Sequence, residues 1–294
     1  KLKYPMALNF MFLHYNTIWQ NLQNYLDPII FSWNNFALRW YSLSYLIAFA
    51  TGYLILLYRI KKQEQPLEFG HSTSLLDKIF FFLILGIILG GRLGYVFFYE
   101  PDYFLRHPIE IFWPFSNGDF VGISGMSFHG GLIGALLAGL WFSKKHHLPF
   151  LPLANFIIPA VPLGYFWGRI GNFLNGELYG RPTDSALGMY FPADLTNQLR
   201  HPSQLYEAFG EGILLFIILW LFRNHPKIKT HLLWLYLIFY GLIRFLIEFF
   251  RQPDLSIGLL WLNLSLGQWL CLAMIVIGII CFTLNQKGSR GSNR

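Results

Sequence analysis

Long apolar stretches, separated by short polar connections, dominate the pattern of this chain. Seven of them have roughly the 17–25 residues with which a helix crosses a bilayer: Tyr41–Tyr58, Ile79–Phe98, Val121–Phe142, Leu151–Phe166, Leu205–Phe222, Leu232–Phe250 and Leu259–Leu284. The fourth is short and contains Pro159 and Pro162, so we expect a helix that is kinked or broken there. The pattern predicts an all-α polytopic membrane protein with seven transmembrane helices.

The same pattern divides the chain into three parts. The first part is an N-terminal interfacial arm, residues 1–38. The second is a seven-helix membrane domain, residues 39–284, with a small extracytoplasmic cap at about 172–203. The third is a cytoplasmic tail, residues 285–294. The arm should contain an amphipathic helix on the membrane surface, because its apolar residues recur at helical spacing among Asn and Gln: Trp19, Leu22, Leu26 and Ile30.

Composition supports a membrane protein, and the distribution of lysine explains the net positive charge of the chain. The chain is 54% hydrophobic and 13% charged, which excludes an ordinary soluble domain. A net charge of +7 is typical of nucleic-acid binding, but after residue 60 the lysines lie only in alternate connections or the tail: Lys61, Lys62, Lys78, Lys144, Lys145, Lys227, Lys229 and Lys287. By the positive-inside rule these segments are cytoplasmic, the N-terminus is outside, and no nucleic-acid partner is expected.

The connections on the opposite side contain arginine but no lysine. A guanidinium binds carboxylates and phosphates through two parallel N–H donors, whereas an ammonium acts as a point charge. This difference between the two sides therefore favours anion binding at the outer face.

Cysteine and histidine positions argue against two kinds of chemistry. Cys271 and Cys281 lie about 15 Å apart on one predicted helix, too far for a disulfide, and neither is a predicted nucleophile. His129 has no second histidine or carboxylate at metal-ligand spacing, so we expect no metal and no cofactor.

The most informative stretch is Gly168–Arg181, which reads GRIGNFLNGELYGR between apolar segments. Ionisable side chains near bilayer depth are expensive, so Arg169 and Glu177 need polar partners or a polar substrate. Glycines such as Gly180 allow backbone to approach a phosphate or a lipid headgroup closely. The alternative is a polar extramembrane loop with glycine turns.

A second polar group lies on the sixth predicted span. Tyr240, Arg244, Glu248 and Arg251 fall within about 80° of one another on a helix. They form either a salt-bridge ladder that locks the fold or part of a shared anion site. Glu207 and Glu211, four residues apart on the fifth span, are candidate counter-ions for a buried arginine.

Three further candidates each have a structural alternative. Arg92 shares a helix face with Tyr95 and Tyr99, and it either serves a site or extends to the outer surface. His129 lies in the run MSFHGGLIG and is either a proton acceptor or a hydrogen-bonded structural group. Tyr41 opens the first span beside residues typical of an aromatic belt.

Five motifs in a fixed order resemble bacterial prolipoprotein diacylglyceryl transferase: GGRLGYVFFY, MSFHGGLIG, GRIGNFLNGELYGR, HPSQLYE and YGLIRFLIEFFRQPD. The likeness runs from about Arg39 to Trp269. It implies a seven-helix enzyme of the bacterial plasma (inner) membrane that moves the diacylglyceryl group of phosphatidylglycerol onto the lipobox cysteine in the signal peptide of a prolipoprotein. The reaction releases glycerol 1-phosphate.

The resemblance also implies roles for single residues. The matching functional positions are Tyr41, His129, Arg169, Asn172, Glu177, Gly180 and Arg244. Where some members have histidine two residues before the tyrosine, this chain has Arg39, which puts a required proton transfer there in doubt.

The residue types suit such a reaction. We expect Arg169 and Arg244 to stabilise the departing phosphate. Neutral hydrogen bonds to the substrate are expected from Asn172, Tyr41 and Tyr240. Substrate-binding contacts or support for the arginines are expected from Glu177, Gly180, Arg92, Glu207 and Glu248. His129 either takes the thiol proton or only orients the lipid.

Two other classes compete with this interpretation. A membrane carrier for an anionic solute would use the same arginines to line a path, but carriers of many folds show paired broken helices, and only one proline-broken span is evident. A scaffold that merely binds membrane lipid explains the apolar mass but not the clustered polar motifs.

Overall fold

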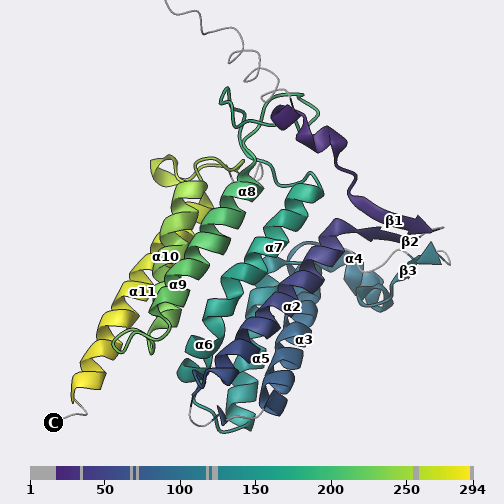
Figure 1. Cartoon of the computed structure of the whole chain (residues 1–294). Coiled ribbons are helices and arrows are strands. Elements are labelled where there is room, and N and C mark those ends of the chain that lie inside the picture. The colour runs from purple at the N-terminus through teal and green to yellow at the C-terminus, as the bar shows by residue number, and fades with distance from the viewer. Residues whose placement is uncertain are drawn as a thin grey trace, which may run out of the picture. The chain divides into compact units, whose positions relative to one another are not determined.

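The computed structural model describes residues 18–33, 36–66, 69–70, 73–116, 119–120, 125–253 and 258–291 (Figure 1). The described chain is mostly helical, and in chain order its α-helices are α2 Trp40–Lys61, α3 Thr73–Phe98, α4 Pro101–Arg106, α5 Phe128–Lys145, α6 Phe150–Ile157, α7 Val161–Leu174, α8 Ser203–Glu207, α9 Leu215–Phe222, α10 Leu232–Ile247 and α11 Leu266–Gly291. Two small sheets pair β1 Ile29–Trp33 with β2 Phe36–Arg39, and β3 Phe115–Ser116 with β4 Asp119–Phe120.

Five helical segments of the described chain are long and apolar enough to cross a membrane: Trp40–Lys61, Thr73–Phe98, Phe150–Leu174, Ser203–Phe222 and Leu266–Asn285. This supports a multi-pass membrane protein. The other two predicted spans correspond to α5 and α10, which have 18 and 16 residues and lie outside this set. The count of seven therefore stays a prediction.

The predicted break in the fourth span is confirmed. Between α6 and α7 a 3-10 turn, Ile158–Ala160, contains Pro159. Proline lacks the N–H that would continue the helical hydrogen bonds, so the turn tightens there. The helix then continues to Leu174, eight residues beyond the predicted end. This extension makes the first half of the central polar stretch helical.

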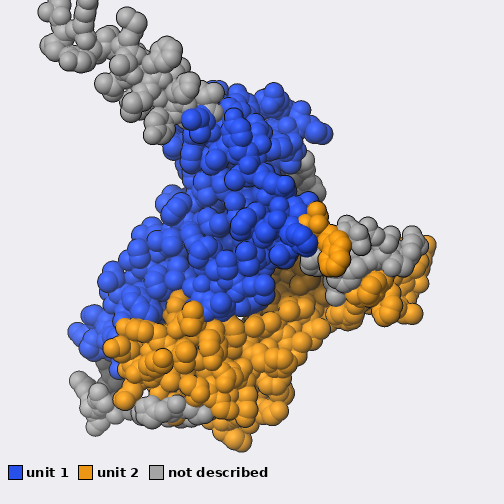
Figure 2. Space-filling view, turned by 45° about the vertical axis from the view of Figure 1, so that its right-hand side comes forward, with its two compact units in different colours: residues 1–31, 38–52, 159–294 blue, residues 32–37, 53–158 orange. Residues whose placement is uncertain are grey.

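The chain forms two compact units, which Figure 2 shows in different colours. Unit 1 comprises Lys1–Phe31, Leu38–Gly52 and Pro159–Arg294, and unit 2 comprises Ser32–Ala37 and Tyr53–Ile158. Helix α2 contributes to both units.

In unit 2, α3 packs along α5 through small residues. A Cβ added to Gly134 would lie 2.0 Å from the carbonyl oxygen of Gly86, and one added to Gly130 would lie 2.3 Å from that of Gly90. Only glycine permits helix backbones to approach so closely, as in many membrane helix pairs. In unit 1, α7, the segment from α8 to α9, and α10 pack together, and α11 packs along α10.

The predicted amphipathic helix of the arm does not extend to Ile30, which lies in a strand. Residues 1–17 lie outside the described part; residues 18–20 are helical, a 3-10 helix follows at Leu22–Tyr25, and the strand β1 then begins at Ile29. Trp19, Leu22 and Leu26 pack against a core formed by Phe173, Met189 and Phe191. Their helical spacing therefore serves burial against protein, because the loop region 175–202 offers an apolar partner.

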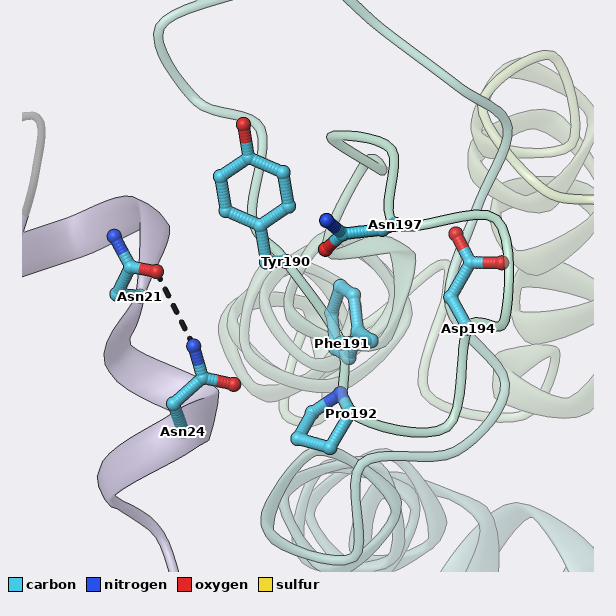
Figure 3. Close-up of a pocket in the computed structure, with 7 residues that line it drawn as sticks. All are labelled: Asn21, Asn24, Tyr190, Phe191, Pro192, Asp194 and Asn197. Carbon is cyan, nitrogen blue, oxygen red and sulfur yellow. Dashed lines mark hydrogen bonds between the residues drawn. The ribbon is translucent and has the colours of Figure 1, made fainter.

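The same loop region and the arm enclose a polar cavity of about 260 Å³ (Figure 3). Asn21 and Asn24, which share a hydrogen bond of 3.2 Å, come from the arm. The other lining residues come from the loop region: Tyr190, Phe191, Pro192, Asp194 and Asn197. None of the site residues predicted from the sequence lines this cavity.

Candidate active site

Helix α7 presents Arg169 and Asn172 three residues apart, on one face of the helix. Arg169 Nη1 donates to Asn172 Oδ1 at 3.2 Å. Asn172 Nδ2 in turn donates to Glu177 Oε1 at 2.8 Å, just beyond the end of the helix. The amide therefore connects a guanidinium to a carboxylate and orients both. The polar-loop alternative is wrong for Gly168–Leu174, which are helical.

Glu207 is the centre of the cluster. Oε2 of its fully buried side chain lies 2.8 Å from Arg169 Nε and 3.0 Å from Arg244 Nη1 in two ion pairs. Arg251 Nη1 contacts the other oxygen, Oε1. The prediction of a counter-ion for buried arginine is confirmed at this residue. One carboxylate thus brings together guanidiniums from α7, α10 and the segment after α10.

The predicted polar stripe of α10 continues past the helix end at Ile247. Arg244 Nη2 contacts Glu248 Oε2 at 2.8 Å, and Arg251 Nε contacts the same oxygen at 3.3 Å. Ser265, just before α11, donates to Glu248 Oε1 at 2.9 Å. The stripe is therefore a salt-bridge ladder that also connects to Glu207, so both predicted roles are compatible with it.

Glu211 lies on a π-helical turn, Ala208–Leu214, between α8 and α9. Its buried carboxylate reaches Arg244 Nη1 only at 3.5 Å, which is 0.5 Å longer than the Glu207 contact. A π turn widens the helix and is frequent at functional sites. Glu211 is the more weakly coupled of the two predicted counter-ions.

Three tyrosines surround these charges. Tyr165, which the sequence analysis missed, donates to Glu207 Oε2 at 2.9 Å, and the Arg169 guanidinium lies 4.7 Å from the centre of its ring. Its position one helical turn before Arg169 was the available signal. Tyr240 packs perpendicular to Tyr165 with ring centres 6.2 Å apart. Tyr41 hydroxyl lies 3.0 Å from that of Tyr45, and its ring faces Gly171, next to Asn172.

Gly180 has a packing requirement that its sequence context did not reveal. It forms a bridge with Arg251, and its N–H donates to the His201 carbonyl at 2.8 Å. A Cβ at this position would lie 2.2 Å from the Phe250 carbonyl oxygen. The absence of a side chain lets the segment that carries Arg251 lie beside the central stretch. A substrate contact by Gly180 stays a prediction.

Arg92 and His129 belong to unit 2. Arg92 is buried and donates to the carbonyls of Glu110 at 2.9 Å and Ile111 at 2.5 Å, with its guanidinium 4.8 Å from the Phe104 ring centre. It therefore holds the connection after α3 and does not extend to the surface. His129 is exposed near the start of α5, with its ring against Phe128. Their roles toward a substrate stay predictions.

The cluster in unit 1 can hold an anion through directed donors. Four guanidiniums and four carboxylates contribute to it: Arg169, Arg181, Arg244 and Arg251, and Glu177, Glu207, Glu211 and Glu248. These charges balance, so attraction by net positive charge is not available. Arg169 is held through its Nε beside Glu207 and its Nη1 beside Asn172. Fixed N–H donors of this kind recognise phosphate oxygens.

The fold and this cluster define a class: a multi-pass helical membrane protein with a buried, ion-paired polar centre. Residues 28–284 match the family model described as prolipoprotein diacylglyceryl transferase. The chain belongs to the prolipoprotein diacylglyceryl transferase family, and it is a transferase.

Relatives named phosphatidylglycerol–prolipoprotein diacylglyceryl transferase are similar over nearly the whole chain. The relative from Chlorobaculum tepidum is 50% identical over 91% of this chain and 92% of its own length. Relatives from Bordetella avium and Wolinella succinogenes are 45% and 43% identical, over 90% and 93% of this chain and 96% and 98% of their own lengths. The sequence resemblance to this family is confirmed.

Proposed function

We propose that this protein transfers the diacylglyceryl group of phosphatidylglycerol to the thiol of the lipobox cysteine in a prolipoprotein signal peptide. The products are a thioether-linked lipoprotein precursor and glycerol 1-phosphate. The names of the relatives support the two substrates. The observation that carries the proposal to particular residues is the convergence of Arg169 and Arg244 on one oxygen of Glu207.

The reaction breaks a carbon–oxygen bond and forms a carbon–sulfur bond. The cysteine sulfur attacks the glyceryl carbon that carries the phosphate, and the electron pair of the broken bond stays on the phosphate oxygen. Negative charge therefore grows on the leaving phosphate, and donors already aimed at it lower the barrier. We assign this role to Arg169 and Arg244, because Glu207, Asn172 and Glu248 hold their guanidiniums before substrate arrives.

Neutral groups and one histidine are the other proposed participants in the reaction. Tyr41, Asn172 and Tyr240 would donate hydrogen bonds to the lipid without adding charge. The thiol has an ordinary pKa of about 8.5 and attacks as the thiolate, so its proton must leave. His129 either accepts that proton or orients the lipid.

The proposed topology has seven spans, with α5 and α10 added to the five long apolar helices. The N-terminus would lie outside, and the lysine-bearing connections and the C-terminus would be cytoplasmic. The loop region 175–202 would then be the extracytoplasmic cap. The arginine cluster would face the outer side, where an exported prolipoprotein presents its cysteine.

The test is a transfer assay in vesicles with labelled phosphatidylglycerol and a lipobox peptide. The proposal predicts label on the peptide, release of glycerol 1-phosphate, and loss of both when the cysteine is replaced by serine. A carrier would instead move an anionic solute across the vesicle membrane without labelling the peptide. A lipid-binding scaffold would retain phosphatidylglycerol unchanged.

His129→Asn separates the two histidine roles. If the imidazole accepts the thiol proton, transfer should fall by about 100-fold or more near neutral pH and recover partly at higher pH, where the thiol ionises unaided. An equal loss at every pH would assign the residue to orienting the lipid. Transfer rates measured from near-neutral to alkaline pH with a saturating peptide distinguish these outcomes.

A further inference from the structure

A cavity of about 480 Å³ in unit 2 lies outside the arginine cluster. It opens between the beginning of α3 and the end of α5, and its lining combines charged with aromatic side chains: Asp77, Lys78, Phe81, Phe82, Lys145 and His146. Nothing in the proposed transfer reaction uses these residues. Their combination of cations and apolar surface indicates a ligand that is itself amphipathic.

The charged groups leave positive charge available at the cavity. The carboxylate of Asp77 accepts a hydrogen bond from Tyr53 Oη at 2.7 Å, which directs it toward α2. Lys145 Nζ lies 4.5 Å from the centre of the Trp141 ring, so an aromatic face is its neighbour. Within the described residues, neither Lys78 nor Lys145 has a carboxylate partner.

His146, the residue after α5, adds a polar group without adding charge. Burial and the neighbouring charges of Lys78 and Lys145 lower the pKa of its imidazole below the ordinary value. The ring is therefore neutral at pH 7 and can exchange hydrogen bonds with a ligand oxygen. Its packing against Phe142, with ring centres 4.3 Å apart, fixes its orientation.

An apolar wall continues from the lysines along both helices. Phe81 and Leu85 on α3, and Leu137 and Trp141 on α5, recur four residues apart and are 38–60% exposed. Phe82 packs against Trp141 with ring centres 4.7 Å apart and joins the two helices at the cavity. Cations at one end of an apolar wall match a phosphate headgroup followed by hydrocarbon chains.

We propose that this cavity binds an anionic phospholipid, with its headgroup phosphate between Lys78 and Lys145 and its acyl chains along Phe81 and Trp141. A soluble phosphate would leave the apolar wall unused, and a zwitterionic lipid would leave the cationic pair without a net counter-charge. The bound lipid is a resident ligand and not a substrate, so the inference is independent of the proposed reaction.

The experiment measures lipid binding to the full-length protein, purified in detergent, by native mass spectrometry. Phosphatidic acid is the anionic probe, phosphatidylcholine is the zwitterionic lipid, and inorganic phosphate is the soluble anion. The test variant is Lys78→Gln/Lys145→Gln, and the matched control is Lys227→Gln/Lys229→Gln, which removes the same charge from another connection. Two lysines at a lipid headgroup correspond to about a tenfold to thirtyfold change in affinity.

The proposal predicts that wild type prefers phosphatidic acid over phosphatidylcholine, and that only the test variant loses this preference. Equal losses in both double variants would overturn it in favour of diffuse surface charge. Equal binding of the two lipids, or displacement by phosphate at the same concentration, would overturn it as well. If the double variant does not fold, Lys78→Gln and Lys145→Gln alone should each weaken phosphatidic acid binding by several-fold, and no change in either is contrary evidence.

Discussion

Arg92 in unit 2 and Arg244 in unit 1 are both largely buried cations in an apolar chain, but different acceptors satisfy them. Arg92 donates to backbone carbonyls and lies over an aromatic ring. Arg244 contacts the carboxylates of Glu207 and Glu248 at 3.0 and 2.8 Å. Carbonyls are neutral and belong to the fold, whereas carboxylates hold a charge that a bound anion must compete with. The first arginine organises a connection, and we propose that the second binds a ligand.

The units also hold their helices together differently. Glycines bring α3 and α5 into backbone contact in unit 2. In unit 1, by contrast, Glu207 joins α7, α8 and α10 through ion pairs and a tyrosine hydroxyl. Small-residue packing depends on shape alone, but a buried ion pair fails when one partner is removed, because the other is left uncompensated. Substitutions in the two units should therefore have different effects.

The largest effect is expected for Glu207→Gln. The amide keeps the shape but removes the charge shared by Arg169, Arg244 and Arg251, so the protein should lose about 3–5 kcal/mol of stability and most transfer activity. Thermal unfolding in detergent and the vesicle transfer assay measure both. The matched variant Glu211→Gln, whose carboxylate reaches Arg244 only at 3.5 Å, should lose clearly less stability. Equal losses would show that Glu207 is not the centre of the network.

Arg244→Lys tests whether the planar guanidinium of Arg244 is required. Lysine keeps the charge but cannot contact Glu207 and Glu248 through two separate nitrogens while presenting a donor to phosphate. We expect about 100-fold or more loss of transfer activity, with folding retained. Near wild-type transfer would refute the assignment.

Arg92→Lys makes the corresponding change in unit 2. The substitution removes the guanidinium N–H groups that donate to the carbonyls of Glu110 and Ile111, which should lower the stability of the protein by about 1–3 kcal/mol. Transfer per folded molecule should change much less than in Arg244→Lys. A loss of activity as large as that of Arg244→Lys, without a loss of stability, would instead place Arg92 at the substrate.

Helix packing in unit 2 should respond to volume. Gly134→Ala would place a Cβ 2.0 Å from the Gly86 carbonyl oxygen, so the helices must separate, at a cost of about 1–3 kcal/mol. Gly139→Ala on the same helix would meet only Phe150 Cε2, at an ordinary 3.5 Å. The measurement is the melting temperature of each variant relative to wild type. Equal shifts in the two variants would mean that helix propensity, and not close packing, is responsible.

Local patterns predicted much of the site. The i, i+4 pair Arg244–Glu248 and the break at Pro159 follow from the sequence within one segment, and the structure contains both. Helical spacing fixes such relations before tertiary structure forms. The family resemblance added expected roles for single residues but no geometry.

Long-range partners were not predictable in the same way. Trp19 and Leu22 bury against Phe191, far along the chain, although their spacing was equally typical of a membrane-surface helix. Apolar periodicity indicates that one face of a helix is buried, but it does not indicate which segment packs against that face. Likewise, the phenol of Tyr165 could not be distinguished from many other aromatic residues until Glu207 was placed 2.9 Å from its hydroxyl.

The smallest effect is expected outside the membrane helices, at the ion pair of Asp194 and Arg200. Arg200 Nε contacts Asp194 Oδ2 at 2.7 Å, and this contact with Arg200 lowers the pKa of the carboxyl to about 2, from 3.8. A lowered folded-state pKa means that the carboxylate stabilises the fold above about pH 4, and that this contribution disappears as pH falls toward 2.

Asp194→Asn should therefore lower the stability of the loop region by no more than about 2 kcal/mol near neutral pH. The difference from wild type should shrink as the pH is lowered from about 5 toward the folded-state pKa. The measurement is protease cleavage within residues 182–200 at each pH, with an acid-stable protease. Because this pair makes no contact with Glu207, transfer activity should follow only the fraction of folded protein, in contrast to every change in the Glu207 cluster. A constant difference at all pH values would show that the introduced amide disturbs packing and that the charge of Asp194 contributes nothing.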